Sequence, residues 1–560
     1  MTDREAQQCH LPPPGFSGIY RADSLARAVY SEAAGIARIV PAAVAVPVDA
    51  DDVVTLVKWA SDSSLSIVPR GSGTSMGGGA IGSGVIVDLS RMDWIGEIDL
   101  ETKTVWTGPG ALRGAVNEAA ELRGLRFPVD PSSGNYCTIG GMASTNAAGA
   151  HTLGFGAMRL WVVALDCIFE DGSRAIVERG QPLPEACPAI ERFIEEGSER
   201  ILTEGMKPAA THGGLSKDSS GYGIHAFAES GELVDLLVGS EGTLALFVGV
   251  KLSLIDAPKE TRGVLGAFAS LEDAVNAAVA ARAAGAVACE LLDRTFLDVA
   301  ASGGAHSPIG ALDSVPAGSE AVLLAEVEGE DAGVADTAAW ELAKSFEQFN
   351  ATSVRVASGA AEQHEIWELR HAASPILSKL DPALKSMQFI EDGAVPPEHL
   401  AEYVRGVRAA LESRAVRGVI FGHAGDAHMH VNPLIDVSRP DWRDKVQGLL
   451  DDVVALTARL HGTLAGEHGD GRLRTPLLDR VWSAEARELF ALVKHAFDPR
   501  GILNPGVKVP LSNQQSLADI KYDPSLAALP ADARRALDHV SDNRAYSELR
   551  LSLVPIAGQK

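Results

Sequence analysis

The stretch LSIVPRGSGTSMGGG, residues 65–79, decides how the N-terminal half of this chain is interpreted. Its apolar start predicts a buried strand, and the strand runs directly into a glycine-rich loop. Clustered glycines let backbone amides converge on an anion at close range. The spacing GxGxxxG does not fit the dinucleotide-binding fingerprint, and the loop lacks the GK[ST] ending of a P-loop. Taken alone, the loop is equally consistent with a phosphate cradle and with a plain tight turn.

Regular elements flank this loop. AVAVPV (43–48) predicts a strand, and DADDVVTLVKWASDSS (49–64) predicts a helix with acidic residues in its first turn. VIVDLS (85–90) predicts a further strand, so the chain opens with a β-α-β unit. Later, LWVVALDCIFEDG (160–172) predicts a strand, and its Asp171-Gly172 pair predicts a hairpin turn into the next one.

Two more stretches are rich in small residues. They are DPSSGNYCTIGGMASTNAAGAHTLGFG (130–156) and LVGSEGTL (237–244), and the second leads to the strand-like run ALFVGVKLSLI. Such stretches pack poorly as core and expose much backbone. We therefore expect them to lie flat against a large ligand.

The segment from Ala257 to about Ser358 alternates strand and helix patterns. GVLGAFAS precedes an alanine-rich helix at 271–285, and a second long helix is expected near 333–348. This pattern predicts a ferredoxin-like unit. Further on, FIEDGAVPPEHL (389–400) is interpreted as a strand and a turn.

The stretch FGHAGDAHMHVNP (421–433) holds three histidines and an aspartate in eight positions, after a run that predicts a buried strand. A second stretch, GEHGDG (466–471), adds a carboxylate and a fourth imidazole. These ligand types suit zinc and similar divalent metals, and an open site needs only three protein ligands. A metal beside a free histidine is a proton-removing centre. A chance cluster on an exposed loop is the alternative for the first stretch alone.

His428 and His430 should point to the same face if residues 428–431 are extended. His428 is then a substrate contact, a substitute metal ligand or a surface residue. In EIWELRHAASP (365–375), Trp367 and Arg370 lie about one helical turn apart. A guanidinium holds a carboxylate through two parallel hydrogen bonds, whereas the alternative for Arg370 is a salt bridge on the surface of a helix.

Composition limits the classes of function. The chain has 560 residues, a length that predicts two to four domains. Its formal net charge of −25 argues against nucleic-acid and anionic-membrane partners. Its five cysteines (9, 137, 167, 187 and 289) form no CxxC pair, so a disulfide framework or an iron–sulfur site is not expected. The sequence shows no signal peptide and no membrane-spanning run. We expect a cytoplasmic protein and leave open a peripheral position at the inner face of the membrane.

The runs PRGSGTS, CTIGGMASTNAAG and VGSEGTLAL resemble, in order and spacing, the three flavin-contacting segments of the vanillyl-alcohol-oxidase-type (PCMH-type) FAD-binding domain. The later half resembles the C-terminal domain of FAD-linked 2-hydroxy-acid dehydrogenases, such as D-lactate dehydrogenases, glycolate oxidase large subunits and D-2-hydroxyglutarate dehydrogenases. The resemblance covers about residues 40 to 508. It implies an α+β fold: a two-lobed PCMH-type FAD-binding domain (40–257) and a ferredoxin-like cap, substrate and metal domain (258–510). A leader (1–39) and a tail (511–560) complete the chain.

The resemblance also implies the residues around the cofactor. The diphosphate would lie in the loop from Arg70 to Ser75. Residues of the two later segments would line the rest of the cofactor, and Asn504 would lie near the flavin ring. The expected FAD-contacting residues are Arg70, Gly71, Ser72, Gly73, Thr74, Ser75, Gly140, Gly141, Ser144, Asn146, Gly242, Thr243 and Asn504. Many relatives attach FAD through a histidine in the first loop, but no histidine lies between residues 11 and 150, so non-covalent FAD is expected. Cys137 is interpreted as a buried structural thiol, with covalent attachment as the alternative.

By the same resemblance, His423, His430 and Glu467 bind a divalent metal, expected to be Zn²⁺. His468 is the base, and Arg370 holds the substrate carboxylate. The family motif HxGDGNxH appears here with Ala427 and His428 in place of the usual glycine and asparagine. The expected reaction is oxidation of a 2-hydroxy acid, D-lactate-like, to the 2-oxo acid. Ile390 stands near the place where the hydroxyglutarate branch has a lysine.

No cysteine follows Cys289, so we expect the electron acceptor to be a separate electron-transfer protein, quinone or iron–sulfur protein. A homodimer is left open. Two other functions compete with the dehydrogenase. One is a transferase like alkyl-glycerone-phosphate synthase, and the other is a non-catalytic FAD-binding subunit of a glycolate-oxidase-type complex.

Overall fold

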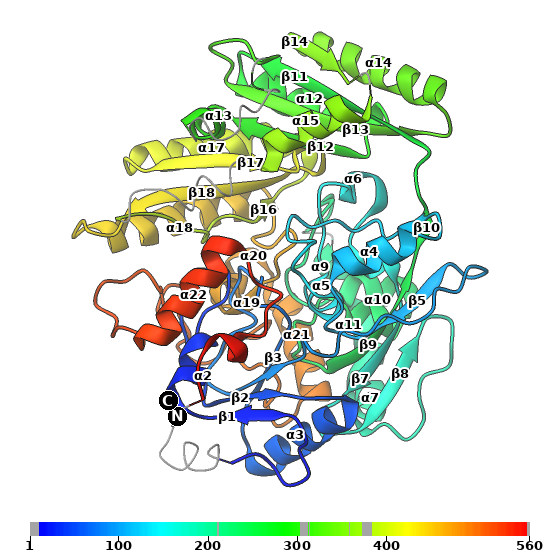
Figure 1. Cartoon of the computed structure of the whole chain (residues 1–560), viewed down its shortest axis with the longest axis vertical. Helices are drawn as coiled ribbons and strands as arrows, with labels where there is room; N and C mark the ends of the chain where they lie inside the picture. Colours follow the sequence, from blue (N-terminus) through cyan, green and yellow to red (C-terminus); the bar gives the residue numbers. More distant parts are fainter. Residues whose placement is uncertain are drawn as a thin grey trace.

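The computed structural model describes residues 11–209, 212–302, 312, 314–357, 359–371 and 383–556. Figure 1 shows a lower part that holds the N-terminal sheets and an upper part built on one large sheet. The chain enters the lower part first, crosses to the upper part near residue 260, and returns to the lower part in its last hundred residues.

The first sheet of the lower part has the strand order β1-β2-β4-β3, in which β2 and β3 run parallel to β4. Its strands are β1 (Ile19–Arg21), β2 (Ala43–Val46), β3 (Ile67–Arg70) and β4 (Val85–Asp88). Helix α3 (Ala50–Ser63) connects β2 to β3, and the side chain of Asp49 caps it by accepting from the amide of Asp52. Its apolar face packs on the sheet, which confirms the predicted β-α-β opening.

The second sheet of the lower part is antiparallel, with the order β5-β9-β7-β8. Its strands are β5 (Thr104–Thr107), β7 (Val162–Ile168), β8 (Arg174–Glu178) and β9 (Leu246–Ser253). The predicted hairpin is present between β7 and β8, where Gly172 takes a φ of +78° that favours glycine. Helices α4 (Arg113–Glu121), α5 (Ile139–Thr145), α7 (Pro188–Phe193), α10 (Ile224–Ser230) and α11 (Leu233–Leu237) supply its covering layer.

Residues from the end of the chain complete the cores of both lower sheets. Helix α21 (Ala484–Phe497) joins the core of the second sheet, where Phe497 stacks on Phe193 with ring centroids 4.9 Å apart. Ile502 and Leu503 join the core of the first sheet, and the amide of Ile67 donates to the carbonyl of Ile502.

The upper sheet begins with four strands in the order β14-β11-β13-β12, all neighbours being antiparallel. The strands are β11 (Glu260–Phe268), β12 (Ala288–Asp293), β13 (Ala321–Gly329) and β14 (Ala351–Val356). Helices α12 (Leu271–Ala283) and α14 (Ala332–Gln348) pack on one face. This order and connectivity are those of a ferredoxin-like unit, which confirms the predicted fold of this part.

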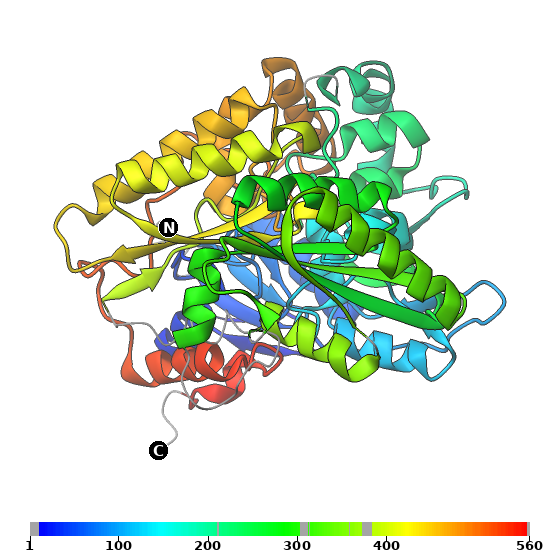
Figure 2. The ribbon, with the colours of Figure 1, turned by 90° about the horizontal axis from the view of Figure 1, so that it is seen from above.

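The sheet continues from β12 through β17 (Arg417–Gly422), β18 (His428–Asp436) and β15 (Leu384–Ser386). Helices α17 (Leu400–Ser413) and α18 (Trp442–Arg459) cover the same face as α12 and α14, as Figure 2 shows from above. The strand and turn expected within 389–400 are present in short form, as strand β16 (Gly393–Ala394) and a 3₁₀ turn (Pro397–His399). Two consecutive prolines follow, at 396 and 397, and lack the amides that a ladder requires.

The described parts of the expected leader and tail pack against each other and against the first sheet. Helix α2 (Ser24–Val29) lies beside α22 (Ala531–Asn543), as Figure 1 shows in blue and red. Leu537, Leu551 and Val554 share a core with Tyr30 of the N-terminal segment. Both ends of the chain therefore contribute to the lower part.

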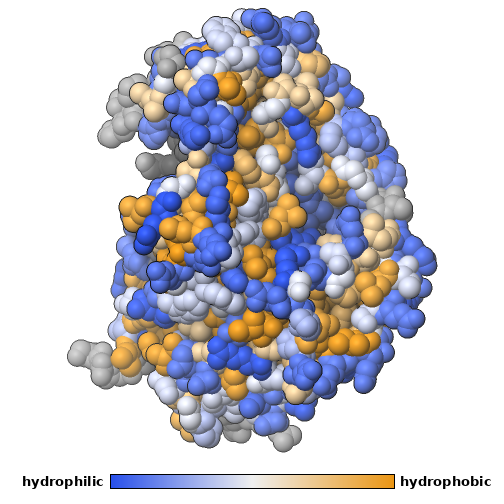
Figure 3. Space-filling view, turned by 90° about the vertical axis from the view of Figure 1, so that its right-hand side faces the viewer, coloured by the Kyte–Doolittle hydropathy of each residue, from blue (hydrophilic) through white to orange (hydrophobic). Residues whose placement is uncertain are grey.

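The surface is mixed in character. On the face shown in Figure 3, hydrophobic residues are interspersed with hydrophilic ones. Within the described ranges, no helix combines the length and the apolar character needed to cross a membrane.

Candidate active site

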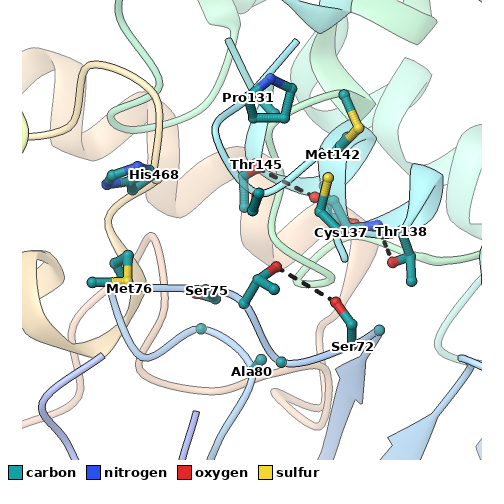
Figure 4. Close-up of a pocket in the computed structure, with 18 of the residues that line it drawn as sticks. Ser72, Ser75, Met76, Ala80, Pro131, Cys137, Thr138, Met142, Thr145 and His468 are labelled. Carbon is teal, nitrogen blue, oxygen red and sulfur yellow. Dashed lines mark hydrogen bonds between the residues drawn. The ribbon is translucent and has the colours of Figure 1, made fainter. Parts of the chain in front are cut away.

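A cavity of about 320 Å³ lies where the lower part meets the upper part. Its lower walls come mainly from three segments, 69–80, 131–148 and 241–247, and each overlaps one of the glycine-rich or small-residue stretches noticed in the sequence. The opposite wall is formed by Arg370, Gln388, Glu391, Phe421, His430, Asn432, Glu467 and His468. Figure 4 shows His468 facing Cys137 and Thr138 across the cavity, with Ser72 and Ser75 on the floor between them.

The glycines of the lower walls are required by close backbone packing. A Cβ atom at Gly71 would lie 2.2 Å from the hydroxyl of Thr138, and one at Gly242 would lie 2.2 Å from the ring of Pro69. Gly242 also has a φ of +68°, which favours glycine. The hydroxyl of Ser75 is buried and has no hydrogen-bond partner among the described atoms. This combination of bare backbone and an unused hydroxyl fits a large polar ligand such as FAD.

Most of the residues expected to contact FAD line the cavity. They are Arg70, Gly71, Ser72, Gly73, Thr74, Ser75, Gly140, Gly141, Ser144 and Gly242. Asn146, Thr243 and Asn504 are buried but do not line it. Asn504 donates to the carbonyls of Gly79 and Glu241, and so ties the first and third segments together. The hydroxyl of Thr243 pairs with Tyr222, and the amide oxygen of Asn146 accepts from the backbone of Arg159.

Arg70 supports the glycine-rich loop from within. Its guanidinium donates to the backbone carbonyls of Tyr30, Glu32 and Ala80 at 3.1–3.4 Å and lies over the ring of Tyr30. The side chain is buried, and this burial lowers its pKa. Because its hydrogen bonds go to backbone carbonyls, Arg70 fixes the shape of the loop.

Four imidazoles and one carboxylate converge at the opposite wall. Glu467 Oε1 lies 3.3 Å from Nε2 of His423, 3.3 Å from Nε2 of His430 and 3.5 Å from Nε2 of His468. His428 lies beside them, with Nδ1 4.0 Å from Glu467 Oε2. The structure therefore brings together the three expected metal ligands and the expected base, and confirms that His428 and His430 share one face of β18.

In His423, His430 and His468, the ring nitrogen that points away from Glu467 is hydrogen-bonded to an acceptor. Nδ1 of His423 pairs with the carboxylate of Glu290, Nδ1 of His430 donates to the carbonyl of Glu391 at 2.8 Å, and Nδ1 of His468 pairs with the Glu391 carboxylate at 2.8 Å. Such outer partners fix the tautomer and direct the remaining lone pair inward. The side chains are thus oriented toward one point.

The pKa values of these histidines diverge. Burial lowers the pKa of His428 to about 4, against the opposing effect of Asp392. Burial also disfavours the charged forms of His430 and His468, but the carboxylates around them outweigh it and raise their pKa values to about 10 and about 9. A cation bound among them would lower both pKa values again, since it repels a second positive charge.

The geometry fits a divalent metal ion. Two ligands bound tetrahedrally to one metal at 2.0–2.1 Å lie about 3.3 Å apart. The carboxylate oxygen of Glu467 has that separation from both His423 and His430. The donor set of two imidazoles and one carboxylate is one that zinc accepts in open sites.

Two charged residues at this centre were not found from the sequence. Lys217 is fully buried and donates to Glu467 Oε2 at 3.2 Å and to the carbonyl of Gly149 at 2.8 Å. Glu290, also fully buried, joins His423 to Arg370. Burial disfavours its charge, but His423 and Arg370 hold the pKa of Glu290 well below its usual range. Neither residue belongs to a motif, and each stands alone in an ordinary segment, so no local signal marked them.

Arg370 lies on α15 (Ala360–His371) and lines the cavity. Its Nε donates to Glu290 at 2.6 Å, and its guanidinium lies 4.9 Å from the centre of the Phe421 ring. The alternative of a surface salt bridge is wrong, because the side chain is only 10% exposed. Residues 372–382, which include the end of the EIWELRHAASP stretch, lie outside the described residues.

Comparison with known families agrees with this architecture. Residues 41–177 match the FAD binding domain, and residues 257–507 match the C-terminal domain of FAD linked oxidases. The chain thus carries an FAD-binding domain of the PCMH type followed by the second domain of these oxidases.

Curated relatives carry related names. The D-2-hydroxyglutarate dehydrogenase of Pseudomonas putida is 30% identical over 90% of this chain. This chain spans only 52% of that relative, about half its length. The glycolate oxidase subunit GlcD of Bacillus subtilis is 29% identical over 86% of this chain and 92% of its own. The D-lactate dehydrogenase of Archaeoglobus fulgidus is 28% identical over 82% of this chain and 89% of its own.

Solved structures share the fold at lower identity. The 4-ethylphenol oxidase from Gulosibacter chungangensis matches with a TM-score of 0.63 and 15% identity, over 90% of this chain and all of that one. An alkyldihydroxyacetonephosphate synthase matches with a TM-score of 0.58 and 13% identity, over 87% and 82% of the two chains. The chain therefore belongs to the FAD-linked oxidases that join a PCMH-type FAD-binding domain to a FAD linked oxidase C-terminal domain.

Proposed function

We propose that this protein is an FAD-dependent dehydrogenase that oxidises a 2-hydroxy acid to the 2-oxo acid. One observation carries the proposal. Nε2 atoms of three histidines converge on the carboxylate of Glu467 in the wall that faces the glycine-rich segments across one cavity. A proton-accepting, metal-binding centre opposite a flavin-binding surface is the arrangement that this chemistry requires.

The cofactor side is assigned to the lower walls. The amides of residues 70–75 would hold the diphosphate, with Gly140, Gly141, Ser144 and Gly242 against the rest of FAD. Asn146, Thr243 and Asn504 would act by bracing these segments, given their backbone contacts. Binding would be non-covalent. Burial raises the pKa of the Cys137 thiol to about 11, which disfavours the nucleophilic thiolate.

The substrate side is assigned to the opposite wall. Arg370 would bind the substrate carboxylate, with Glu290 fixing the plane of its guanidinium. His423, His430 and Glu467 would hold a divalent cation, for which we favour Zn²⁺. When bound, FAD supplies a hydride acceptor and the cation lowers the pKa of the substrate hydroxyl. His468 would accept the hydroxyl proton as the hydrogen on the adjacent carbon leaves as hydride and the carbonyl forms.

A small monocarboxylate, D-lactate-like, is the favoured substrate class. Arg70 and Arg370 are the only lysine or arginine side chains among the described residues that line the cavity. Arg70 is committed to backbone carbonyls, so one cation remains for one carboxylate. Since D-2-hydroxyglutarate carries two carboxylates, it would leave the second without a cationic partner from these residues. The electrons would pass to a separate acceptor, and we favour a cytoplasmic location.

An anaerobic absorbance assay tests the proposal. The purified, metal-replete protein should show a flavin band that one of D-lactate, L-lactate, glycolate and D-2-hydroxyglutarate bleaches. Replacing His468 by Ala should slow bleaching about 10²–10⁴-fold, the range for a lost general base. The same replacement of His539, an exposed histidine on α22, should leave the rate unchanged.

Other outcomes point to the competing functions. A bound flavin that none of these acids reduces would favour a transferase like alkyl-glycerone-phosphate synthase or a non-catalytic subunit. Failure to bind FAD at all would overturn the assignment of the lower walls.

A further inference from the structure

His428 stands at the position where the family motif normally has asparagine, and its surroundings are those of a metal ligand. The side chain is fully buried. Its Nε2 pairs with the carboxylate of Asp392 at 2.9 Å, so Nε2 carries the hydrogen and Nδ1 presents a lone pair. Nδ1 is buried and has no hydrogen-bond partner among the described atoms.

The distance of this nitrogen from Glu467 is informative. Nδ1 of His428 lies 4.0 Å from Glu467 Oε2, too far for a hydrogen bond between them. A lone pair this close to a carboxylate oxygen is repelled by it unless a cation lies between them. Bonds of 2.0–2.1 Å from zinc to nitrogen or oxygen let one ion contact two atoms up to about 4.1 Å apart, so the 4.0 Å separation is bridged by an ion close to the line between them, and a small rotation of either side chain brings it to the tetrahedral spacing. One cation can therefore contact both atoms.

The surroundings hold the ring in this orientation. Asp392 accepts from His428 and also from the backbone amides of Glu467 and His468. A Cβ atom at Gly466 would lie 2.6 Å from the His428 ring, so the backbone there packs directly against the imidazole. Lys217 donates to the same carboxylate oxygen of Glu467, which neutralises part of its charge but leaves Nδ1 of His428 without a partner.

We propose that His428 is a fourth protein ligand of the metal, so that this chain binds its cation through three imidazoles and one carboxylate. Its ligating atoms, with those of His423, His430 and Glu467, all lie within 4.8 Å of one another. Replacement of the usual asparagine thus gives a more strongly bound metal centre. The inference rests on the metal site of the proposed function but does not depend on which acid is oxidised.

Metal retention tests this inference. The variant His428→Asn restores the family residue and keeps an amide that can donate to Asp392. After dialysis against graded chelator, zinc measured by mass spectrometry should be lost from H428N at a concentration of chelator at least about 100-fold lower than from the unchanged protein. Loss of an outer partner alone costs 10–100-fold. H225N, the same replacement at a half-buried histidine on α10, should behave like the unchanged protein.

A second measurement needs no variant. X-ray absorption at the zinc edge of the unchanged, substrate-free protein should require three imidazole ligands, and a fit that requires only two would overturn the inference. Equal retention in H428N and the unchanged protein would also overturn it. His423→Ala separates the two claims: if H423A keeps its zinc, the metal site of the proposed function is wrong. If H423A loses zinc and H428N does not, only the role of His428 is wrong.

Discussion

A buried cation such as Arg370 is tolerated only because a carboxylate shares its burial. Glu290 contributes that charge and also contacts His423, so Arg370 and the histidine cluster share one anion. We therefore expect Arg370 and His423 to be coupled, with double replacements that are not additive.

Replacing Arg370 by Lys should raise the KM for the 2-hydroxy acid about 10–100-fold. Lysine keeps the charge and can still pair with Glu290, but it lacks the fork that binds a carboxylate through two hydrogen bonds. Steady-state kinetics would measure the change. R174K, in the β7–β8 hairpin and paired with Asp166, is the matched control and should leave KM unaltered. An unchanged KM in R370K would remove Arg370 from the substrate site.

Asp293 predicts a dependence of stability on pH. Burial raises the pKa of this carboxyl to about 7, although it caps α13 (Arg294–Ser302) by accepting from the amide of Phe296. In the unfolded chain its pKa is near 3.9, so the folded state binds the extra proton between these values and stability falls as pH rises through 7. The difference corresponds to about 4 kcal/mol at most.

The variant Asp293→Asn keeps the cap but carries no charge to bury. Urea unfolding at pH 5.5 and pH 8.5 should show the unchanged protein losing about 2 kcal/mol relative to D293N at the higher pH, because only the interval between pH 5.5 and the folded pKa contributes. If the free energies of unfolding of the two proteins change equally between these pH values, Arg408, 4.0 Å away, already neutralises the carboxylate.

At the scale of elements, the FAD-binding surface is formed by loops whose backbones pack tightly against one another. Gly242 packs against Pro69 at the end of β3, and Gly71 packs against Thr138 before α5. Asn504 links residues 79 and 241 from a third direction. A change in one of these segments therefore displaces the others.

Gly242→Ala should lower the amount of FAD that the purified protein retains by at least about tenfold. The added methyl meets the ring of Pro69 and also strains a backbone at positive φ. The ratio of flavin to protein absorbance measures the effect. G231A is the matched control, because Gly231 has a φ of +72° but nothing within 4 Å of an added Cβ. It should lose stability of about 1 kcal/mol without losing flavin. Equal flavin content in both variants would contradict the prediction.

The elements show what local sequence patterns can and cannot specify. Helix α3, the β7–β8 hairpin and strand β17 were predictable because each is encoded by contiguous periodicity, a turn pair or a short apolar run. His423, His430, Glu467 and His468 were predictable because two compact motifs contain them. Lys217 and Glu290 were not, since only tertiary folding brings them within reach of those motifs.

At the scale of the whole molecule, the two ends of the chain support the cofactor side. Leu551 is buried in the core shared by α2, α22 and the first sheet. Its neighbour Arg550 lies with a guanidinium nitrogen 3.5 Å from the carbonyl of Ser72 in the glycine-rich loop. The C-terminal segment is thus part of the platform under the loop.

Leu551→Ala should reduce the free energy of unfolding by about 2–4 kcal/mol, the usual cost of emptying such a site. The substitution leaves a void in the core next to Arg550, which contacts the glycine-rich loop. Flavin should therefore also be released at a lower urea concentration than from the unchanged protein. Circular dichroism and flavin fluorescence, followed together, measure both effects. L526A, at an exposed position before α22, provides the comparison and should change neither. A loss of stability without earlier flavin release would limit the role of the segment to folding.

Because residues 478–503 return to the lower part, the cores of its two sheets cannot be completed until late in synthesis of the chain. The first 257 residues emerge with an apolar surface that α21, Ile502 and Leu503 cover in the finished protein. At ordinary rates of synthesis, the wait for those residues is on the order of tens of seconds. The upper part, whose sheet is complete by residue 436, can fold first. The nascent chain therefore carries an incomplete N-terminal half, and this half is the part that depends on protection by chaperones during translation.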